Sequence, residues 1–235
     1  MIDPTRHRQL EELNMVELCT RILQNSRNEL YLNMRYLDVA LSSLGFEADP
    51  GCGGVGTDGF ILYYHPDALC RMYQRGRVTV NRAYLHVVFH CLFCHMDTRG
   101  RRQMPLWNLA CDIAVESVID GLYLRCVHVP ATLYRRDWYG RLEKQLNVLN
   151  AEGVYRELAR MQRETGLTEK QLARLAEEFY VDDHGFWELP QDAPKNSIMR
   201  QNQWNKNRDK LQTEMETMGN QQEEDARSLL EQVQV

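Results

Sequence analysis

The sequence contains no apolar run long enough to span a bilayer. A membrane-crossing helix needs about 20 mostly apolar residues, and charged or polar residues interrupt every apolar stretch of this 235-residue chain. The first residues, MIDPTRHRQLEE, also lack the apolar core of a secretion signal. We therefore predict no membrane partner and a cytoplasmic location.

Clustered basic charge is equally scarce. The formal net charge is −5 and the sequence pI is about 5.8. One dense basic run exists, formed by Arg99, Arg101 and Arg102, and it is typical of a solvated loop. Because nucleic-acid binding usually needs a clustered basic face, we predict no nucleic-acid partner.

Cysteine pairs with a familiar spacing are also few. The seven cysteines are an odd number, and in a chain without an export signal they are most simply reduced thiols. Cys91, Cys94 and His95 spell CxxCH, the pattern of covalent haem attachment, but they lie within an apolar helical pattern. No second pair stands at similar spacing to complete a zinc knuckle. Neither a haem nor a zinc-knuckle interpretation is favoured.

Apolar periodicity predicts a predominantly helical α+β fold with a small sheet. Apolar residues recur at intervals of three and four between residues 8 and 45 and again between 141 and 180. The glycine-rich stretch ADPGCGGVGTDG fits no nucleotide-binding motif and predicts a turn before a short strand, Phe60–His65. Proline and glycine delimit two further helices, one from Pro66 to Gly76 and one from Pro105 to Gly121.

We divide the chain at residue 190. Residues 1–190 form the predicted main domain, and residues 191–235 a polar helical tail or linker. Trp204, Leu211, Met215 and Met218 recur on one face of that tail. They predict docking, either onto this chain or onto a partner.

The candidate chemistry centres on the stretch NRAYLHVVFHCLFCHMDTRG, where His86 and His90 stand four residues apart. Side chains at this spacing share one helix face and can converge on one metal ion. Asp112 lies in the apolar segment LACDIAVE, where an unpaired carboxylate would be costly, and Glu116 follows one turn later. Asp112 is therefore the predicted third ligand, and Glu116 an alternative ligand or a general base. A metal-free Asp–His pair between two helices would satisfy the same pattern.

Other polar residues rank lower. His95 lies nine residues beyond His86, about 900° around a helix, so it becomes a ligand only if the helix breaks before it. No glycine is present to break it, and we place His95 after Asp112. The run Asp182–His184 could form an accessory site, but an exposed turn is the favoured interpretation. Trp107, Trp138 and Trp187 are predicted to be core or docking aromatics.

Several segments in a fixed order resemble a known family. These are TDG at 57–59, HPDAL at 65–69, the HxxxHxxxxH helix, WNLACDIAVE at 107–116, NAEGVYREL at 150–158 and VDDHGFWE at 181–188. The order is similar to that of the metallopeptidase domain of bacterial proteins that also carry a von Willebrand factor A-like domain, over roughly residues 20–190. The resemblance implies a minimal zincin-like fold that binds zinc through the histidines of the helix. By position, His86, His90, His95 and Asp112 correspond to the family's metal-site residues.

The chain departs from this family at the catalytic position. The family usually reads HExxH, in which the glutamate acts as general base on a zinc-bound water, whereas this chain reads HVVFH with Val87 in its place. We predict a zinc-binding, metallopeptidase-like domain with impaired peptide hydrolysis, and Glu116 as the candidate base if activity survives. A peptide or protein substrate could pair along the strand Phe60–His65. The alternative is a metal-free interaction or regulatory module that works with an AAA+ ATPase, as the resemblance suggests.

Overall fold

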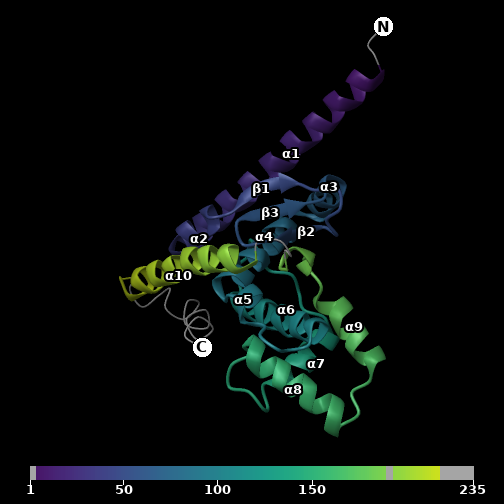
Figure 1. Cartoon of the computed structure of the whole chain (residues 1–235), viewed down its shortest axis with the longest axis vertical. Helices are drawn as coiled ribbons and strands as arrows, with labels where there is room; N and C mark the ends of the chain where they lie inside the picture. Colours follow the sequence, from purple (N-terminus) through teal and green to yellow (C-terminus); the bar gives the residue numbers. More distant parts are fainter. Residues whose placement is uncertain (1–3, 189–192, 218–235) are drawn as a thin grey trace.

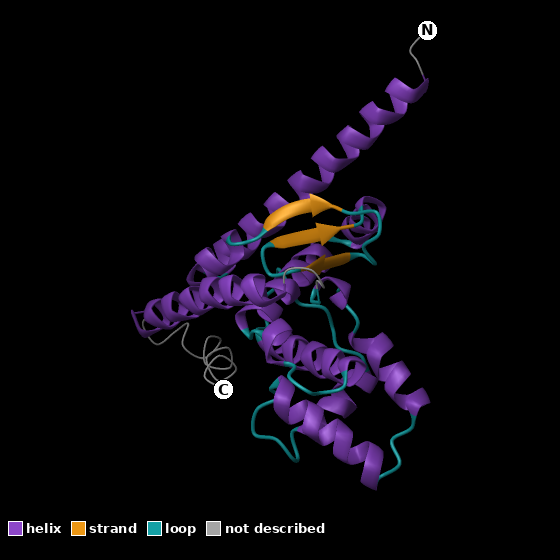
Figure 2. Cartoon of the chain, viewed as in Figure 1, coloured by secondary structure: helices purple, strands orange, loops and turns teal. Residues whose placement is uncertain are grey.

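The computed structural model describes residues 4–188 and 193–217. Helices dominate, and they surround one small sheet (Figures 1 and 2), which confirms the predicted α+β class. The helices are α1 (Pro4–Asn33), α2 (Asp38–Ser42), α3 (Pro66–Arg75), α4 (Arg77–Leu92), α5 (His95–Thr98), α6 (Met104–Gly121), α7 (Leu133–Leu142), α8 (Ala151–Glu164), α9 (Glu169–Phe179) and α10 (Ala193–Thr217). Two 3₁₀ turns, η1 (Arg35–Leu37) and η2 (His184–Phe186), and three strands, β1 (Gly45–Ala48), β2 (Val55–Thr57) and β3 (Ile61–Tyr64), complete the described part.

The sheet has the strand order β1-β3-β2, with β1 parallel and β2 antiparallel to β3. Strand β3 confirms the strand predicted from residue 60 to 65. It lies in the centre of the sheet, so the prediction that a peptide pairs along this strand is wrong, because both of its edges are occupied. The outer edge of β2 is met by Asp183, whose backbone N–H donates to the carbonyl of Val55 at 2.7 Å.

The N-terminal part is one long helix followed by short turns. Helix α1 runs unbroken from Pro4 to Asn33, and its N-terminal half extends away from the rest of the fold (Figure 1). Its C-terminal half packs against α4 and buries Cys19, Leu23 and Leu30. The helical pattern predicted to end at Gly45 instead stops at Ser42, and Gly45 begins β1.

The turn between β2 and β3, which carries the TDG sequence, is the docking point of α10. Gly59 has a φ of 92°, and a Cβ atom there would lie 2.2 Å from Cδ of Arg200, so only glycine fits. The indole N–H of Trp204 donates to the carbonyl of Gly59 at 2.8 Å, and Arg200 donates to the carbonyl of Asp58 at 2.9 Å. The apolar face predicted for the tail therefore docks onto this chain.

Three members of that apolar face are buried, namely Trp204, Leu211 and Met215. Met218 lies outside the described residues. Arg200 also pairs with Asp97 of α5 at 2.6 Å, which ties α10 to the short helix that follows α4. The division of the chain at residue 190 stays a prediction.

Helix α4, which bears His86 and His90, ends earlier than the sequence predicts. It starts at Arg77, and the buried side-chain amide of Asn81 donates to the carbonyl of Cys126 at 3.0 Å. The helix ends at Leu92, and Cys94 adopts a left-handed conformation with φ 55° before α5 begins at His95. The expectation of an unbroken helix through His95 is therefore wrong.

Helices α6 to α9 form a second layer below α4 (Figure 1), with a core of their own. Pro105 stands in the first turn of α6, as predicted, because proline lacks only an N–H that the first turn does not use. A capping box starts α9, with Thr168 and Gln171 bonded reciprocally. Trp107, Trp138 and Trp187 are buried, as predicted.

Throughout the described ranges, no helix combines the length and apolar character that crossing a membrane requires.

Candidate metal centre

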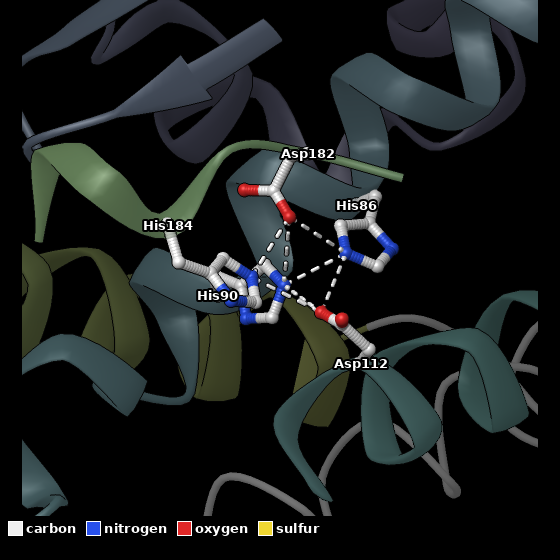
Figure 3. A group of neighbouring side chains, drawn as sticks. All are labelled: His86, His90, Asp112, Asp182 and His184. Atoms are coloured by element: carbon white, nitrogen blue, oxygen red, sulfur yellow. Dashed lines mark hydrogen bonds and ion pairs between the residues drawn. The ribbon is translucent and has the colours of Figure 1, made fainter. Parts of the chain in front are cut away.

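Five side chains from three parts of the chain converge on one buried point (Figure 3). His86 and His90 come from α4 and Asp112 from α6, while Asp182 and His184 come from the segment that follows α9. Each offers one ligand atom, and these atoms all lie within 4.8 Å of one another.

The donor atoms have the spacing expected around a single ion. Nε2 of His184 lies 2.9 Å from Oδ1 of Asp182 and 3.1 Å from Oδ1 of Asp112. Nε2 of His90 lies 2.7 Å from Nε2 of His86 and 3.3 Å from Oδ1 of Asp112. Atoms held about 2.0–2.2 Å from a common metal ion are separated by about these distances.

Several of these polar atoms have no hydrogen-bond partner although they are buried. They are Oδ1 of Asp112, both carboxylate oxygens of Asp182 and Nε2 of His184. A buried polar atom without a partner carries a substantial free-energy penalty, and a cation at the common point would remove it. Three imidazole nitrogens and two carboxylate oxygens are also a donor set that first-row divalent metals accept. The residues therefore fit a metal ion.

The electrostatics of the cluster favour a cation. Burial alone would raise the pKa of Asp112 and Asp182, but the charge of the neighbouring histidines, above all His184, holds both well below the usual range. Burial would lower the pKa of His184, yet the charges of Asp112 and Asp182 raise it to about 10. Two charged carboxylates thus face the centre.

Glu116 lies behind His86. Its Oε1 atom is 2.9 Å from Nδ1 of His86, and its Oε2 atom accepts hydrogen bonds from Arg82 at 2.5 Å and Arg135 at 2.6 Å. Although burial opposes it, the hydrogen bond with His86 and the charge of Arg82 lower the pKa of Glu116 to about 2. A charged carboxylate accepts, so Nδ1 of His86 donates a proton to it, and Nε2 is the nitrogen that faces the cluster. The role of Glu116 as a base stays a prediction.

His95 occupies an equivalent place behind His90. The helix break at Cys94 brings Nδ1 of His95 to 2.9 Å from Nδ1 of His90, and His95 is not one of the five converging residues. Burial and the neighbouring His90 hold the pKa of His95 well below its usual value. A neutral His95 can accept the proton of His90 Nδ1, which leaves Nε2 of His90 for the cluster.

Asp182 and His184 are the members that sequence reasoning missed. An exposed turn was favoured for this run, and that interpretation is wrong, because the side chains of Asp182 and His184 are 0% and 8% exposed. Asp183 alone behaves as a turn residue, since it accepts hydrogen bonds from the backbone of Gly53 and Gly185, both at 2.9 Å. The available signal was the DxH spacing inside VDDHGFWE, one of the segments that carried the family resemblance.

A cavity of about 530 Å³ leads to the cluster. Asp112, Asp182 and His184 lie on its wall, and the surrounding surface is mainly apolar, with Leu109 and Trp187 among the lining residues. The ring of Trp187 stands 3.9 Å, centroid to centroid, from that of His184 and fixes its orientation. The cavity therefore opens directly beside the cluster, whose donor atoms are themselves buried.

The family described as "Putative metallopeptidase domain" matches residues 20–228. The match spans most of the chain and includes α4, α6, the segment 181–188 and α10. The chain therefore belongs to this family. Searches of curated proteins and of solved structures gave no significant match.

Proposed function

We propose that this protein is a zincin-like domain that binds one zinc ion and hydrolyses peptides weakly or not at all. The observation that carries the proposal is the convergence of five donor atoms within 4.8 Å, several of them buried without hydrogen bonds. The five residues that would hold the ion are His86, His90, Asp112, Asp182 and His184. Imidazole and carboxylate ligands suit zinc.

The donor set supports a binding role over a catalytic one. Catalytic zinc sites have three protein ligands and keep an open position, whereas structural sites are closed. Five protein donors here leave little space at the ion, and all their side chains are 8% exposed or less. When bound, zinc would act as a Lewis acid that polarises an oxygen atom in contact with it.

Neither of the two positions considered for a general base, 87 and 116, offers a free one. Val87, at the position of the family's catalytic glutamate, is buried in the core and cannot exchange a proton. Both oxygens of Glu116 are engaged, one by His86 and the other by Arg82 and Arg135. We propose that Glu116 positions His86. The predicted role of Glu116 as a general base is tested below with the Glu116→Gln variant.

A second candidate function is an interaction or regulatory module, with an AAA+ ATPase as the partner that the family resemblance suggested. The extended N-terminal half of α1 favours it, because Leu10 and Leu13 there are 49% and 66% exposed. The docked tail lends this candidate no support, since its apolar face is covered by the chain itself. A metal ion and a partner-binding role are compatible.

Elemental analysis of protein purified without chelator or histidine tag tests the proposal. We expect about one zinc per chain, with a strong loss of zinc in Asp182→Asn and none in the exposed control His128→Ala. Turnover of a broad peptide library by the zinc-loaded protein should stay near background. A zinc content near zero after reconstitution would contradict the proposal that the domain binds zinc. Robust peptide turnover would contradict the proposal that hydrolysis is weak or absent. Turnover abolished by Glu116→Gln would establish Glu116 as the base.

A further inference from the structure

A second cavity, of about 500 Å³, lies beside Glu116 and apart from the cavity that opens onto the metal centre. Its walls come from α3, α4 and α7, from the glycines at 53–54 and from the segment 129–132. Four arginines line it, against two carboxylates, Glu116 and Glu178. The proposed function assigns this cavity no role.

Two of the four arginines form its inner wall and are largely neutralised. Arg82 pairs with Glu116 at 2.5 Å and with Asp120 at 2.6 Å. Arg135 pairs with Glu116 at 2.6 Å through its Nη1 atom. Its Nε atom is buried and makes no hydrogen bond; the distance from this atom to Oε1 of Glu178 is 3.5 Å. This buried cationic donor therefore has an ion-pair partner but no hydrogen bond.

The other two arginines stand at the rim with no counter-ion. Arg71 and Arg75 are four residues apart on α3 and so share one face of that helix. Both are exposed, and within residues 4–188 and 193–217 neither forms a hydrogen bond or an ion pair. Arg77, just beyond the end of α3, differs in pairing with Glu29 at 3.7 Å. The unbalanced positive charge of the cavity thus comes from Arg71 and Arg75.

We propose that this cavity binds the oxyanion group of an acidic ligand, a carboxylate or a phosphate, between the Arg71–Arg75 pair and Nε of Arg135. Guanidinium groups match both anions with paired, charge-assisted hydrogen bonds. The cavity volume of about 500 Å³ can hold the rest of a small ligand, and Thr79 on its wall carries a hydroxyl group that can donate to it. The proposal stands independently of the zinc assignment.

The site would give the domain a recognition element next to its metal centre. Glu116 connects the two, because one of its oxygens binds His86 while the other binds the arginines of the cavity wall. An acidic side chain, a C-terminus and a phosphorylated group all present an oxyanion to the arginines at the rim. The experiment below distinguishes carboxylate from phosphate ligands.

Isothermal titration with inorganic phosphate and with glutarate, at constant ionic strength set by chloride, tests the proposal. The variant is Arg71→Ala/Arg75→Ala. The matched control is Arg77→Ala/Arg156→Ala, which removes the same charge from exposed positions outside the cavity. We expect saturable binding of at least one anion by the wild type, at least tenfold weaker binding by the variant and a change below twofold in the control.

The outcomes separate the sources of the anion and the ways in which the proposal fails. Tighter binding of phosphate identifies a phosphate-type ligand, and tighter binding of glutarate a carboxylate ligand. No saturable binding of either anion overturns the proposal. So does an equal loss in both double variants, which would mean general surface charge, or undiminished binding in Arg71→Ala/Arg75→Ala, which would place the anion elsewhere. Zinc content, measured on the same samples, reports on the metal centre separately.

Discussion

Glu116 and His86 meet through a hydrogen bond of 2.9 Å between Oε1 and Nδ1, on the side of the imidazole that faces away from the other donors. The carboxylate thus fixes the tautomer of His86 without touching the common point. Its remaining oxygen is held by Arg82 and Arg135, so its position is set by charge on both sides. Such partners orient a metal ligand and raise its basicity.

Glu116→Gln should lower zinc affinity by about 10–100-fold, the usual effect of removing such a partner. A glutamine can still accept from Nδ1 of His86, but it carries no charge to balance Arg82 and Arg135. Competition with a chromophoric zinc chelator measures the affinity, and the exposed Glu177→Gln serves as control. Unchanged affinity in Glu116→Gln would mean that its carboxylate does not position His86.

His95 and His184 should differ in their effect on zinc binding. His184 supplies Nε2 to the cluster, whereas His95 reaches only Nδ1 of His90 at 2.9 Å. His184→Ala removes a donor and should abolish stoichiometric binding, while His95→Ala removes a supporting contact and should weaken it by about 10–100-fold. Zinc content after dialysis against a range of free zinc concentrations compares the two variants. Equal losses would make His95 a ligand.

The sequence carried enough information to predict the helical half of the centre. His86, His90 and Asp112 lie on regular helices, where the 3.6-residue repeat determines which side chains share a face, so their convergence could be inferred from spacing. The segment with Asp182 and His184 has no such repeat. Its position depends on the backbone contact of Asp183 with β2. That strand has only three residues and lies in a glycine-rich stretch, so it shows no alternation of apolar and polar residues from which it could be predicted.

The placement of His95 shows a different limit. Its distance from the cluster was judged from an unbroken helix, because no glycine marks an end. The chain nevertheless turns at Cys94, which adopts φ 55°, a conformation that few residues other than glycine take up. Tertiary contacts stabilise this turn, including the hydrogen bond from the indole of Trp107 to the carbonyl of His95 at 3.1 Å. Contacts of this kind are not visible in a local pattern.

Val87→Glu should destabilise the fold. Val87 is 0% exposed, and an isolated carboxylate in its place would cost several kcal/mol. Thermal unfolding with and without zinc, next to the exposed control Val129→Glu, measures the effect. If zinc restores the stability of Val87→Glu and peptide turnover appears, its carboxylate reaches the metal centre and the site retains the geometry of an active enzyme. A variant as stable as the control would contradict the burial of this position.

Trp204→Ala should reduce the free energy of unfolding of the whole domain by about 3–5 kcal/mol, the usual range for a buried tryptophan. The side chain is 1% exposed and donates to the carbonyl of Gly59. Ile198→Ala, at a position of the same helix that is 59% exposed, should change it by less than about 0.5 kcal/mol. Urea denaturation followed by circular dichroism compares them. Equal stability of both variants would show that α10 is not part of the cooperative unit.

Two buried thiols should make the fold sensitive to alkaline pH. Burial and the contact with Cys70 raise the pKa of Cys19 to about 12, and burial raises that of Cys52 to about 11. An unfolded thiol titrates near about 8.5, so the stability that these groups contribute is complete below that pH and is lost as pH rises toward 11–12. Between pH 8 and 10.5 the wild type should lose about 1–2 kcal/mol per thiol more than Cys19→Ala/Cys52→Ala, after allowance for screening. Urea titrations at both pH values measure the difference, and parallel losses in the two proteins would show that these thiols ionise freely in the folded state.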